Sequence, residues 1–504
     1  MWWWILWVVL ALLGLLAIWD VFQRKHAILR NFPIVGHFRY LLEMIGPELR
    51  QYIVTANDEE QPFNRDQRRW VYASSKKQDN YFGFGTDNDL ERSDNHLVIK
   101  HATFPVEPPK ATKDGLYAVP CAKVLGEKRG RAHKFRPASV INISAMSYGS
   151  LSAPAVEALN EGSRICGCIH NTGEGGVASY HQKGADLIWQ IGTGYFGCRS
   201  ADGGFDLAKF KEVVEANPIR AIELKLSQGA KPGMGGILPA AKITPEISEI
   251  RGIPMGVDCV SPSGHSAFSD VDSLLDFVEM LASETGLPIG IKSAVGDHEF
   301  GEELSESMAS GVRGVDFITV DGGEGGTGAG PLVFTDHVSL PFKLGFTRVY
   351  TEFARRGIHQ DVVFVGSAKL GFPEASLLAF SLGCDLINVG REAMMAIGCI
   401  QAQRCHNGHC PTGVATQNKW LMRGLDPTHK AARLANYVVA LRKELHLLTT
   451  ACGVPHPGLV TSEHLEILDD AFGSRTPREV FGYDPGWGLP SPKDRAEITK
   501  LMCA

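Results

Sequence analysis

The sequence predicts an α/β protein built on a closed barrel of eight parallel strands with helices between them. From about residue 139 to 390, short apolar, β-branched runs alternate with amphipathic stretches, which is typical of βα units. Eight units favour a (β/α)8 TIM barrel over an open sheet, and no G-x-G-x-x-G fingerprint follows the first strand. The expected strands are Val140–Ala145, Cys166–Asn171, Ala221–Leu226, Met255–Val260, Pro288–Ser293, Phe317–Asp321, Val362–Gly366 and Leu386–Gly390.

The chain of 504 residues has room for one barrel of about 250 residues and for extensions at both ends. Leucine and valine residues at helical spacing between Thr428 and Leu448, ended by Gly453 and Pro455, predict a helix after the barrel. The expected segments are a transmembrane helix at 1–19, an N-terminal extension wrapped on the barrel at 20–135, the barrel at 136–420 with a cysteine loop at 399–410, and a C-terminal helical extension at 421–504.

The first nineteen residues, MWWWILWVVLALLGLLAIW, carry no charge. About twenty helical residues span the roughly 30 Å hydrocarbon layer of a bilayer, so we expect a single transmembrane helix. A cleaved signal peptide would have a positive leading region, a shorter apolar run and a small-residue cleavage site, which this segment lacks. Arg24, Lys25 and Arg30 follow the apolar run, and the positive-inside rule therefore places the catalytic domain in the cytoplasm.

The composition argues against two classes of protein. The net charge of −6 arises from 50 basic and 56 acidic residues that are mixed along the chain, so no nucleic-acid partner is expected. The eleven cysteines are odd in number and scattered, unlike the framework of a secreted disulfide-rich domain. A reducing compartment fits this pattern better.

The residues just after each strand carry the information on chemistry, because barrel active sites lie at the carboxyl ends of the strands. Lys225, Gln228 and Lys231 end and follow one strand, and two cations at the barrel mouth suit a dicarboxylate substrate. Lys292 closes another strand, where a lysine can stabilise negative charge developing on a reduced flavin ring. The glycine-rich turns, which let backbone reach a planar ligand, are Met146-Ser147-Tyr148-Gly149, Asn171-Thr172-Gly173-Glu174-Gly175-Gly176 and Gly322-Gly323-Glu324-Gly325-Gly326.

Two further turns end the last two strands, at Gly366-Ser367 and Gly390-Arg391. Barrels commonly bind phosphate at this place through backbone amides, and here an arginine is available for the dianion. The phosphate of FMN matches these features.

Three cysteines, Cys399, Cys405 and Cys410, lie in one loop with five and then four residues between them. Three thiolates followed by Pro411 suit a 3Fe-4S cluster with three protein-bound irons. A zinc site completed by His406 or His409 and unmetallated thiols remain alternatives.

Taken in order, these motifs resemble the FMN-binding synthase domain of glutamate synthase, over about Ile141 to Gln417. The resemblance implies reduction of 2-iminoglutarate, formed from 2-oxoglutarate and ammonia, to L-glutamate, with FMN and a 3Fe-4S cluster. It also implies that Lys225, Gln228 and Lys231 hold the keto acid and that Glu174, Gln228 and Lys231 act at the reacting face. The implied FMN contacts are Met146, Ser147, Lys292, Gly322, Gly323, Gly366, Ser367, Gly390 and Arg391.

The sequence departs from that family in several ways. No glutaminase domain with a leading cysteine nucleophile precedes the barrel, so free ammonia or an ammonia-supplying subunit is expected. No pyridine-nucleotide fingerprint appears, so the electron donor should be ferredoxin, a flavoprotein subunit or a membrane carrier. Met234 stands where the family usually has an acidic residue. Another keto acid, an N-substituted amino acid, or a role as a tethered electron-transfer flavoprotein therefore remain alternatives.

Overall fold

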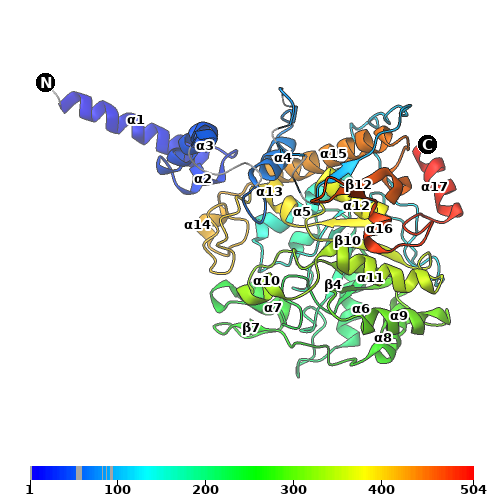
Figure 1. Cartoon of the computed structure of the whole chain (residues 1–504). Helices are drawn as coiled ribbons and strands as arrows, with labels where there is room; N and C mark the ends of the chain where they lie inside the picture. Colours follow the sequence, from blue (N-terminus) through cyan, green and yellow to red (C-terminus); the bar gives the residue numbers. More distant parts are fainter. Residues whose placement is uncertain are drawn as a thin grey trace.

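The computed structural model describes residues 3–52, 59–81, 83–86, 88–90, 93 and 95–503. Met1 and Trp2, the first two residues of the expected membrane helix, lie outside the described residues. Figure 1 shows a rounded body with helix α1 projecting from one side and the C-terminal helix α17 on the opposite side.

Eight parallel strands form a closed barrel, which confirms the predicted fold class. The neighbours around the barrel follow chain order, and β11 pairs with β2, with Ile387 opposite Ile141, to close it. Nearly every strand residue is buried, as expected for parallel strands covered on both faces. The strands are β2 (Ile141–Ile143), β3 (His170–Asn171), β4 (Leu187–Ile191), β5 (Ile219–Lys225), β8 (Ile289–Ser293), β9 (Phe317–Asp321), β10 (Val363–Ser367) and β11 (Leu386–Val389).

One expected strand was wrong and one barrel strand was missed. Met255–Val260 contributes only β7 (Cys259–Val260), which pairs with β6 (Ile237–Leu238) in a separate two-stranded sheet. The third barrel strand is instead β4, which the chain reaches from β3 through a loop containing only a short 3-10 turn, Ser179–His181. The expected run Cys166–Asn171 is a strand only at its end, because Cys166 closes helix α5.

The helices surround the barrel and extend beyond it at both ends (Figure 1). The helix expected between Thr428 and Leu448 is present as α15 and packs closely along α5. The helices are α1 (Trp3–Phe22), α2 (Ala27–Asn31), α3 (Val35–Tyr52), α4 (Arg65–Ser75), α5 (Ala153–Cys166), α6 (Leu207–Ala216), α7 (Pro245–Arg251), α8 (Val271–Thr285), α9 (Glu299–Ala309), α10 (Leu332–His337), α11 (Phe342–Arg355), α12 (Pro373–Ser381), α13 (Arg391–Ile397), α14 (Lys419–Met422), α15 (Pro427–Ala451), α16 (Pro477–Phe481) and α17 (Pro492–Cys503).

The segments outside the barrel pack against the helices around it and pair with each other. In α4, Trp70 packs against Phe372 and Tyr437 with ring centroids 5.9 and 5.8 Å apart. Strand β1 (Leu97–Ile99) pairs antiparallel with β12 (Leu465–Leu468), which also pairs with β13 (Ser474–Arg475). The C-terminal segment is therefore part helix and part sheet. The arm before the barrel is joined to it by the pairing of β1 with β12.

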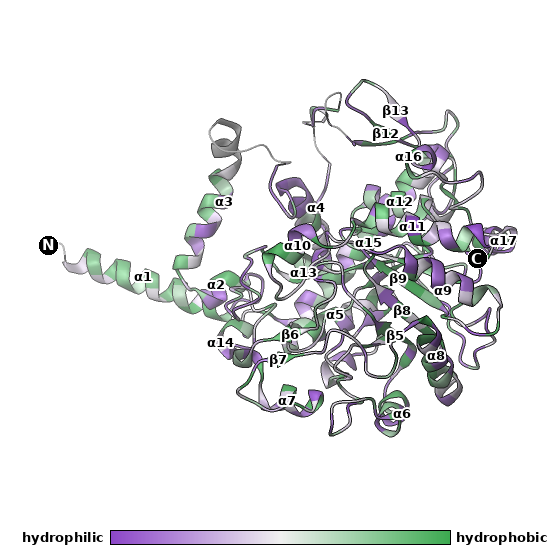
Figure 2. Ribbon diagram, turned by 60° about the horizontal axis from the view of Figure 1, so that its bottom comes forward, coloured by the Kyte–Doolittle hydropathy of each residue, from purple (hydrophilic) through white to green (hydrophobic). Residues whose placement is uncertain are grey.

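Helix α1 is apolar along nearly its whole length and stands away from the body (Figure 2). In the part of the chain that the structure describes, it is the one helix long and apolar enough to cross a membrane, with 6% of its most apolar window buried. A signal sequence would pass the same test of length and composition.

Candidate active site at the barrel mouth

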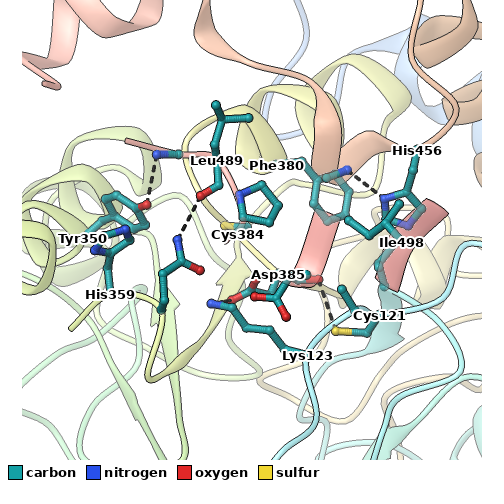
Figure 3. A pocket seen from close by; sticks show the side chains of 18 residues that line it. Cys121, Lys123, Tyr350, His359, Phe380, Cys384, Asp385, His456, Leu489 and Ile498 are labelled. Carbon is teal, nitrogen blue, oxygen red and sulfur yellow. Dashed lines mark hydrogen bonds and ion pairs between the residues drawn. The ribbon is translucent and has the colours of Figure 1, made fainter. Parts of the chain in front are cut away.

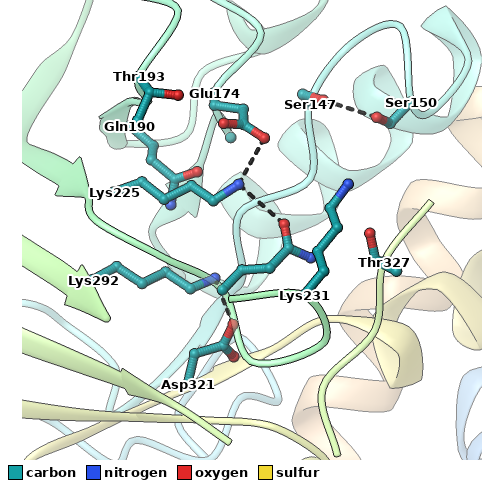
Figure 4. A network of polar contacts seen from close by, with 12 residues as sticks. Ser147, Ser150, Glu174, Gln190, Thr193, Lys225, Lys231, Lys292, Asp321 and Thr327 are labelled. Atoms are coloured by element: carbon teal, nitrogen blue, oxygen red, sulfur yellow. Dashed lines mark hydrogen bonds and ion pairs between the residues drawn. The ribbon is translucent and has the colours of Figure 1, made fainter. Parts of the chain in front are cut away.

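The carboxyl ends of the strands bring the expected substrate residues together (Figure 4). Lys225, the last residue of β5, donates a hydrogen bond of 2.6 Å from its Nζ to Oε1 of Glu174 and one of 3.0 Å to Oε1 of Gln228. Burial works to raise the pKa of Glu174, but the Lys225 ammonium lowers it below the ordinary value, so Glu174 is a carboxylate. Lys225 and Glu174 therefore form an ion pair at the mouth of the barrel.

Lys231 lies in the loop after β5 and is almost fully buried. Its Nζ donates a hydrogen bond of 2.7 Å to the backbone carbonyl of Ala329, in the glycine-rich loop after β9. Burial and the nearby Lys225 lower the pKa of Lys231 to about 8. A second buried cation beside Lys225 is a site that an anionic ligand would stabilise.

Lys292, at the end of β8, is buried and paired with Asp321 at 3.3 Å. Burial lowers the pKa of Lys292, but Asp321 and then Glu223 outweigh it, so the pKa lies above its ordinary value. The same Asp321 carboxylate accepts the backbone N–H of Gly229 at 2.9 Å. The structure therefore has a charged lysine at the end of β8, and its role in stabilising negative charge on a reduced flavin stays a prediction.

The mouth loops approach one another so closely that glycine is required at two positions. A Cβ on Gly173, whose φ is +69°, would lie 2.6 Å from the backbone nitrogen of Ser147, next to Met146. A Cβ on Gly229 would lie 1.8 Å from the backbone oxygen of Gly322. Larger residues would push the loops apart, so these glycines set the dimensions of the site.

The backbone amides of two expected cofactor residues are already used inside the protein. Gly322 donates its N–H to the carbonyl of Ser367 at 3.0 Å, and Gly323 donates its N–H to the carbonyl of Leu340 at 2.8 Å. Gly322 holds the loop after β9 on the end of β10, and Gly323 holds it on the segment before α11. In a ligand site, these two glycines would let the backbone approach the ligand closely, but their N–H groups would not donate to it.

The expected phosphate site gathers two cations. Arg391 begins α13 directly after Gly390, and Lys369 follows Gly366 and Ser367 in a turn where Ala368 and Lys369 have φ of +125° and +49°. Burial lowers the pKa of both Lys369 and Arg391, and the charge of Arg391 lowers the pKa of Lys369 further. A dianion would relieve this repulsion, so the residues present fit a phosphate.

Phe63, from the arm before the barrel, lies under both cations. Its ring centroid is 5.1 Å from Nζ of Lys369 and 4.8 Å from the guanidinium carbon of Arg391. Sequence reasoning found Arg391 but missed Lys369 and Phe63, since neither belongs to a glycine motif.

Arg251 is a further cation that sequence reasoning missed. It ends α7, is 4% exposed, and donates a hydrogen bond of 2.9 Å to the carbonyl of Tyr148. Its guanidinium lies 5.0 Å from the ring centroid of Phe196, and its Nε is buried with no hydrogen-bond partner. Burial lowers its pKa, while Cys259 and Glu174 raise it. Nothing in the sequence around Arg251 marks it as part of the mouth.

The cysteine loop follows α13 and is covered by the arm before the barrel. The Tyr72 hydroxyl donates a hydrogen bond of 2.9 Å to the carbonyl of Cys399. Burial raises the pKa of Cys399 and Cys405, and the Cys410 thiol raises each further. Nearby, the buried Lys242 ammonium favours the thiolate of Cys405.

In the described residues no group of three or more His, Cys, Asp or Glu side chains converges as the ligands of one metal ion. Three thiols in one loop beside a buried cation are the donor set that a cluster with three protein-bound irons would use.

A cavity at the other end of the barrel is structural (Figure 3). There the Nζ of Lys123 donates to the carbonyl of Val362 at 2.9 Å and to Asp385 at 3.0 Å, so its charge is satisfied. His456 hydrogen-bonds the carbonyl of Pro120 at 3.0 Å. Because Val362 and Asp385 directly precede β10 and β11, the cavity lies at the amino ends of the strands, where polar groups contribute to stability.

The barrel and the charged groups at its mouth together define a (β/α)8-barrel enzyme. Residues 121–455 match the conserved region in glutamate synthase. The chain is 37% identical over 478 residues to the glutamate synthase large subunit-like protein YerD of Bacillus subtilis, covering 88% of this chain and 90% of that protein. The chain therefore belongs to the glutamate synthase family, and it is an oxidoreductase of that type.

Other relatives match over a shorter region. An archaeal glutamate synthase [NADPH] of Methanocaldococcus jannaschii is 34% identical over 319 residues, which cover 62% of this chain and 59% of that protein. A solved structure of mandelate oxidase with (S)-mandelic acid covers 80% of this chain and 90% of its own, at 12% identity and a TM-score of 0.45. At that TM-score the structural likeness carries no argument about function.

Proposed function

We propose that the chain forms L-glutamate by reducing 2-iminoglutarate, the product of 2-oxoglutarate and ammonia, with FMN and a 3Fe-4S cluster. The observation that carries this proposal is the convergence of Lys225, Lys231 and the Glu174 carboxylate at the barrel mouth. Condensation of the keto acid with ammonia releases water, and two electrons and two protons then convert the imine to the amine. FMN, when bound, supplies the electron pair as a hydride.

The chain's own residues would position the substrate. Lys225 and Lys231 offer two ammonium groups for two carboxylates, and Gln228 adds an amide whose Nε2 lies 3.2 Å from the carbonyl of Gly326. With its pKa near 8, Lys231 is also suited to give a proton to the nitrogen of the imine. Glu174 holds Lys225 in place through their hydrogen bond.

The cofactor contacts follow the same geometry. The proposed FMN residues are those that surround the mouth: Lys292 would stabilise negative charge on the reduced flavin, and Lys369, Arg391 and the Gly366-Ser367 turn would hold the phosphate. Cys399, Cys405 and Cys410 would hold the cluster next to α13, which also carries Arg391. The electron donor would be ferredoxin, a flavoprotein subunit or a membrane carrier, and ammonia would come free or from a separate subunit.

We also propose that α1 crosses the membrane once and that the barrel lies in the cytoplasm. The support is the uncharged length of α1 and the cations Arg24, Lys25 and Arg30 that follow it. Under this proposal the enzyme works at a membrane surface.

The experiment that tests the substrate assignment compares Lys231→Met with wild type and with the exposed control Lys500→Met. Titration of the oxidised holoenzyme with 2-oxoglutarate, followed by flavin absorbance, should show binding in wild type and control. In Lys231→Met we expect the affinity to fall by about 10- to 100-fold, the loss of one charged hydrogen bond, with the flavin retained. Equal affinities in all three proteins, or tighter binding of a different keto acid, would move the proposal to another substrate.

A further inference from the structure

Helix α3 carries an apolar stripe that no other part of the described chain covers. Val35, Phe38, Leu42 and Ile45 follow one another at spacings of three and four residues and are exposed, Val35 to 75% and Phe38 to 63%. An ion pair between Arg39 and Glu43 at 2.6 Å lies along one edge of this stripe. A helix with one apolar and one charged side is suited to lie at an interface between water and an apolar phase.

The start of α3 is fixed to the end of α1. Asp20, near the end of α1, is fully buried, and its Oδ2 accepts the backbone N–H of Ile34 at 2.9 Å. The Nε2 of His37, in the first turn of α3, lies 2.9 Å from Oδ1 of the same carboxylate. Figure 2 shows α3 running across the direction of α1 instead of continuing it. A buried carboxylate with two partners makes this corner a defined joint, so α3 cannot be placed independently of α1.

The short helix between them is fixed to the cysteine loop. The Nδ2 of Asn31 donates hydrogen bonds of 2.9 Å to the carbonyls of Pro411, the residue after Cys410, and of Leu421. The indole N–H of Trp420 donates to the carbonyl of Asn31 at 3.1 Å. The corner between α1 and α3 therefore sits directly on the loop that carries the three cysteines.

We propose that α3 lies in the headgroup region of the same bilayer that α1 crosses, with its apolar stripe toward the acyl chains. The occupant is a lipid surface because the stripe is continuous, through a fixed joint, with a helix that is itself exposed and apolar. The cations Arg24, Lys25 and Arg30 between the two helices suit anionic headgroups. The inference rests on the proposed membrane span, and its consequence is that the cysteine loop faces the membrane surface.

The test places a polarity-sensitive fluorophore at single sites on α3 of the full-length protein. In a Cys503→Ser background, Phe38→Cys and Ile45→Cys label the apolar stripe, and Arg39→Cys and Glu43→Cys label its charged edge. Each protein is reconstituted into vesicles of phosphatidylcholine and phosphatidylglycerol, with or without doxyl groups on the acyl chains. We expect blue-shifted emission and loss of fluorescence with doxyl lipid at 38 and 45, a smaller change at 39 and the smallest change at 43, which lies farthest round the helix from the stripe.

Two results would overturn the proposal. Labels at 38 and 45 that behave as those at 39 and 43 would show that the stripe is in water. A blue shift at 38 and 45 without quenching by doxyl lipid would show that a protein covers the stripe, either a second copy or a partner. Alkaline carbonate extraction of the same vesicles tests the membrane span separately from the position of α3. Release of the protein would contradict the membrane span itself. Retention with an unquenched stripe would contradict only the position of α3.

Discussion

Lys231 lies in an environment that brings its loss of charge close to neutral pH. Burial and the neighbouring Lys225 lower its pKa to about 8, so its ammonium form is present below that pH and is lost as the pH rises through it. If Lys231 binds a carboxylate as a cation, the affinity for 2-oxoglutarate should be constant below about pH 8 and fall about tenfold per unit above it.

The control is Lys231→Arg, since a guanidinium stays charged throughout this range. In that variant we expect the loss of affinity at alkaline pH to disappear, even if binding is weaker overall. An affinity that rises through pH 8 in wild type would mean that Lys231 acts in its neutral form, contrary to the proposed role. Titration of the holoenzyme at several pH values decides between these outcomes.

Lys369 gives a second prediction for a single residue. If Lys369 and Arg391 bind the FMN phosphate, then Lys369→Met should weaken FMN binding by about 10- to 100-fold, the loss of one charged hydrogen bond. Riboflavin, which lacks the phosphate, should bind equally well to the variant and to wild type. Fluorescence titration of the apoprotein with both flavins measures the difference, with the exposed Lys343→Met as control. Equal losses for FMN and riboflavin would place Lys369 elsewhere in the site.

At the scale of elements, the contact between α5 and α15 depends on one glycine. A Cβ on Gly162 would lie 2.8 Å from the backbone oxygen of Ala431 and 2.8 Å from Cδ2 of Leu434, so the two helices approach each other closely there. Helical glycines elsewhere have more room, and the nearest atom to a Cβ on Gly301 in α9 is 3.9 Å away. Local packing, not helix propensity, decides the effect of alanine at each position.

We therefore expect opposite effects of the same substitution. Gly162→Ala should lower the free energy of unfolding by about 1–3 kcal/mol through overpacking. Gly301→Ala should be neutral or raise it by up to ~1 kcal/mol, because alanine loses less backbone entropy in a helix. Denaturant unfolding of the two variants beside wild type checks the signs. Stabilisation by Gly162→Ala would show that α15 does not pack on α5 as described.

Elements also explain which parts of the fold could be predicted from the sequence. Seven barrel strands were found because each is a short apolar run ending in a glycine or polar turn. Leu187–Ile191 was missed because no crossover helix separates it from β3, so the alternation of strand and helix fails there. Cys259–Val260 was mistaken for a barrel strand, since a short apolar run does not show which sheet it joins.

The candidate site also has residues that the sequence could predict and residues that it could not. Glu174, Lys225 and Gln228 stand in motifs beside strand ends, and barrel topology alone brings strand ends together. Arg251, Lys369 and Phe63 come from a helix end, a strained turn and the arm before the barrel. Only tertiary packing places them near the mouth, so no local pattern could have identified them.

For the whole molecule, the arrangement links the N-terminal helices, the cysteine loop and the barrel mouth in one path. Helix α2, which follows α1, ends on the cysteine loop, and α13, between that loop and the mouth, begins with Arg391. Electrons that enter near the membrane surface would have a short route to a flavin at the mouth. This layout suits a donor at the membrane, and it predicts that the enzyme needs its N-terminal helices for physiological reduction but not for reaction with substrate.

The measurement that tests the central claim most directly is anaerobic reoxidation of the reduced full-length holoenzyme. The flavin is reduced chemically, and 2-oxoglutarate with ammonium is then added while absorbance is followed and the amino acid formed is identified. We expect reoxidation with one L-glutamate formed per reduced flavin, and no reoxidation by either compound alone. Intact flavin and cluster spectra with no reoxidation, and no glutamate, would contradict the proposed reaction while leaving the fold and family unchanged.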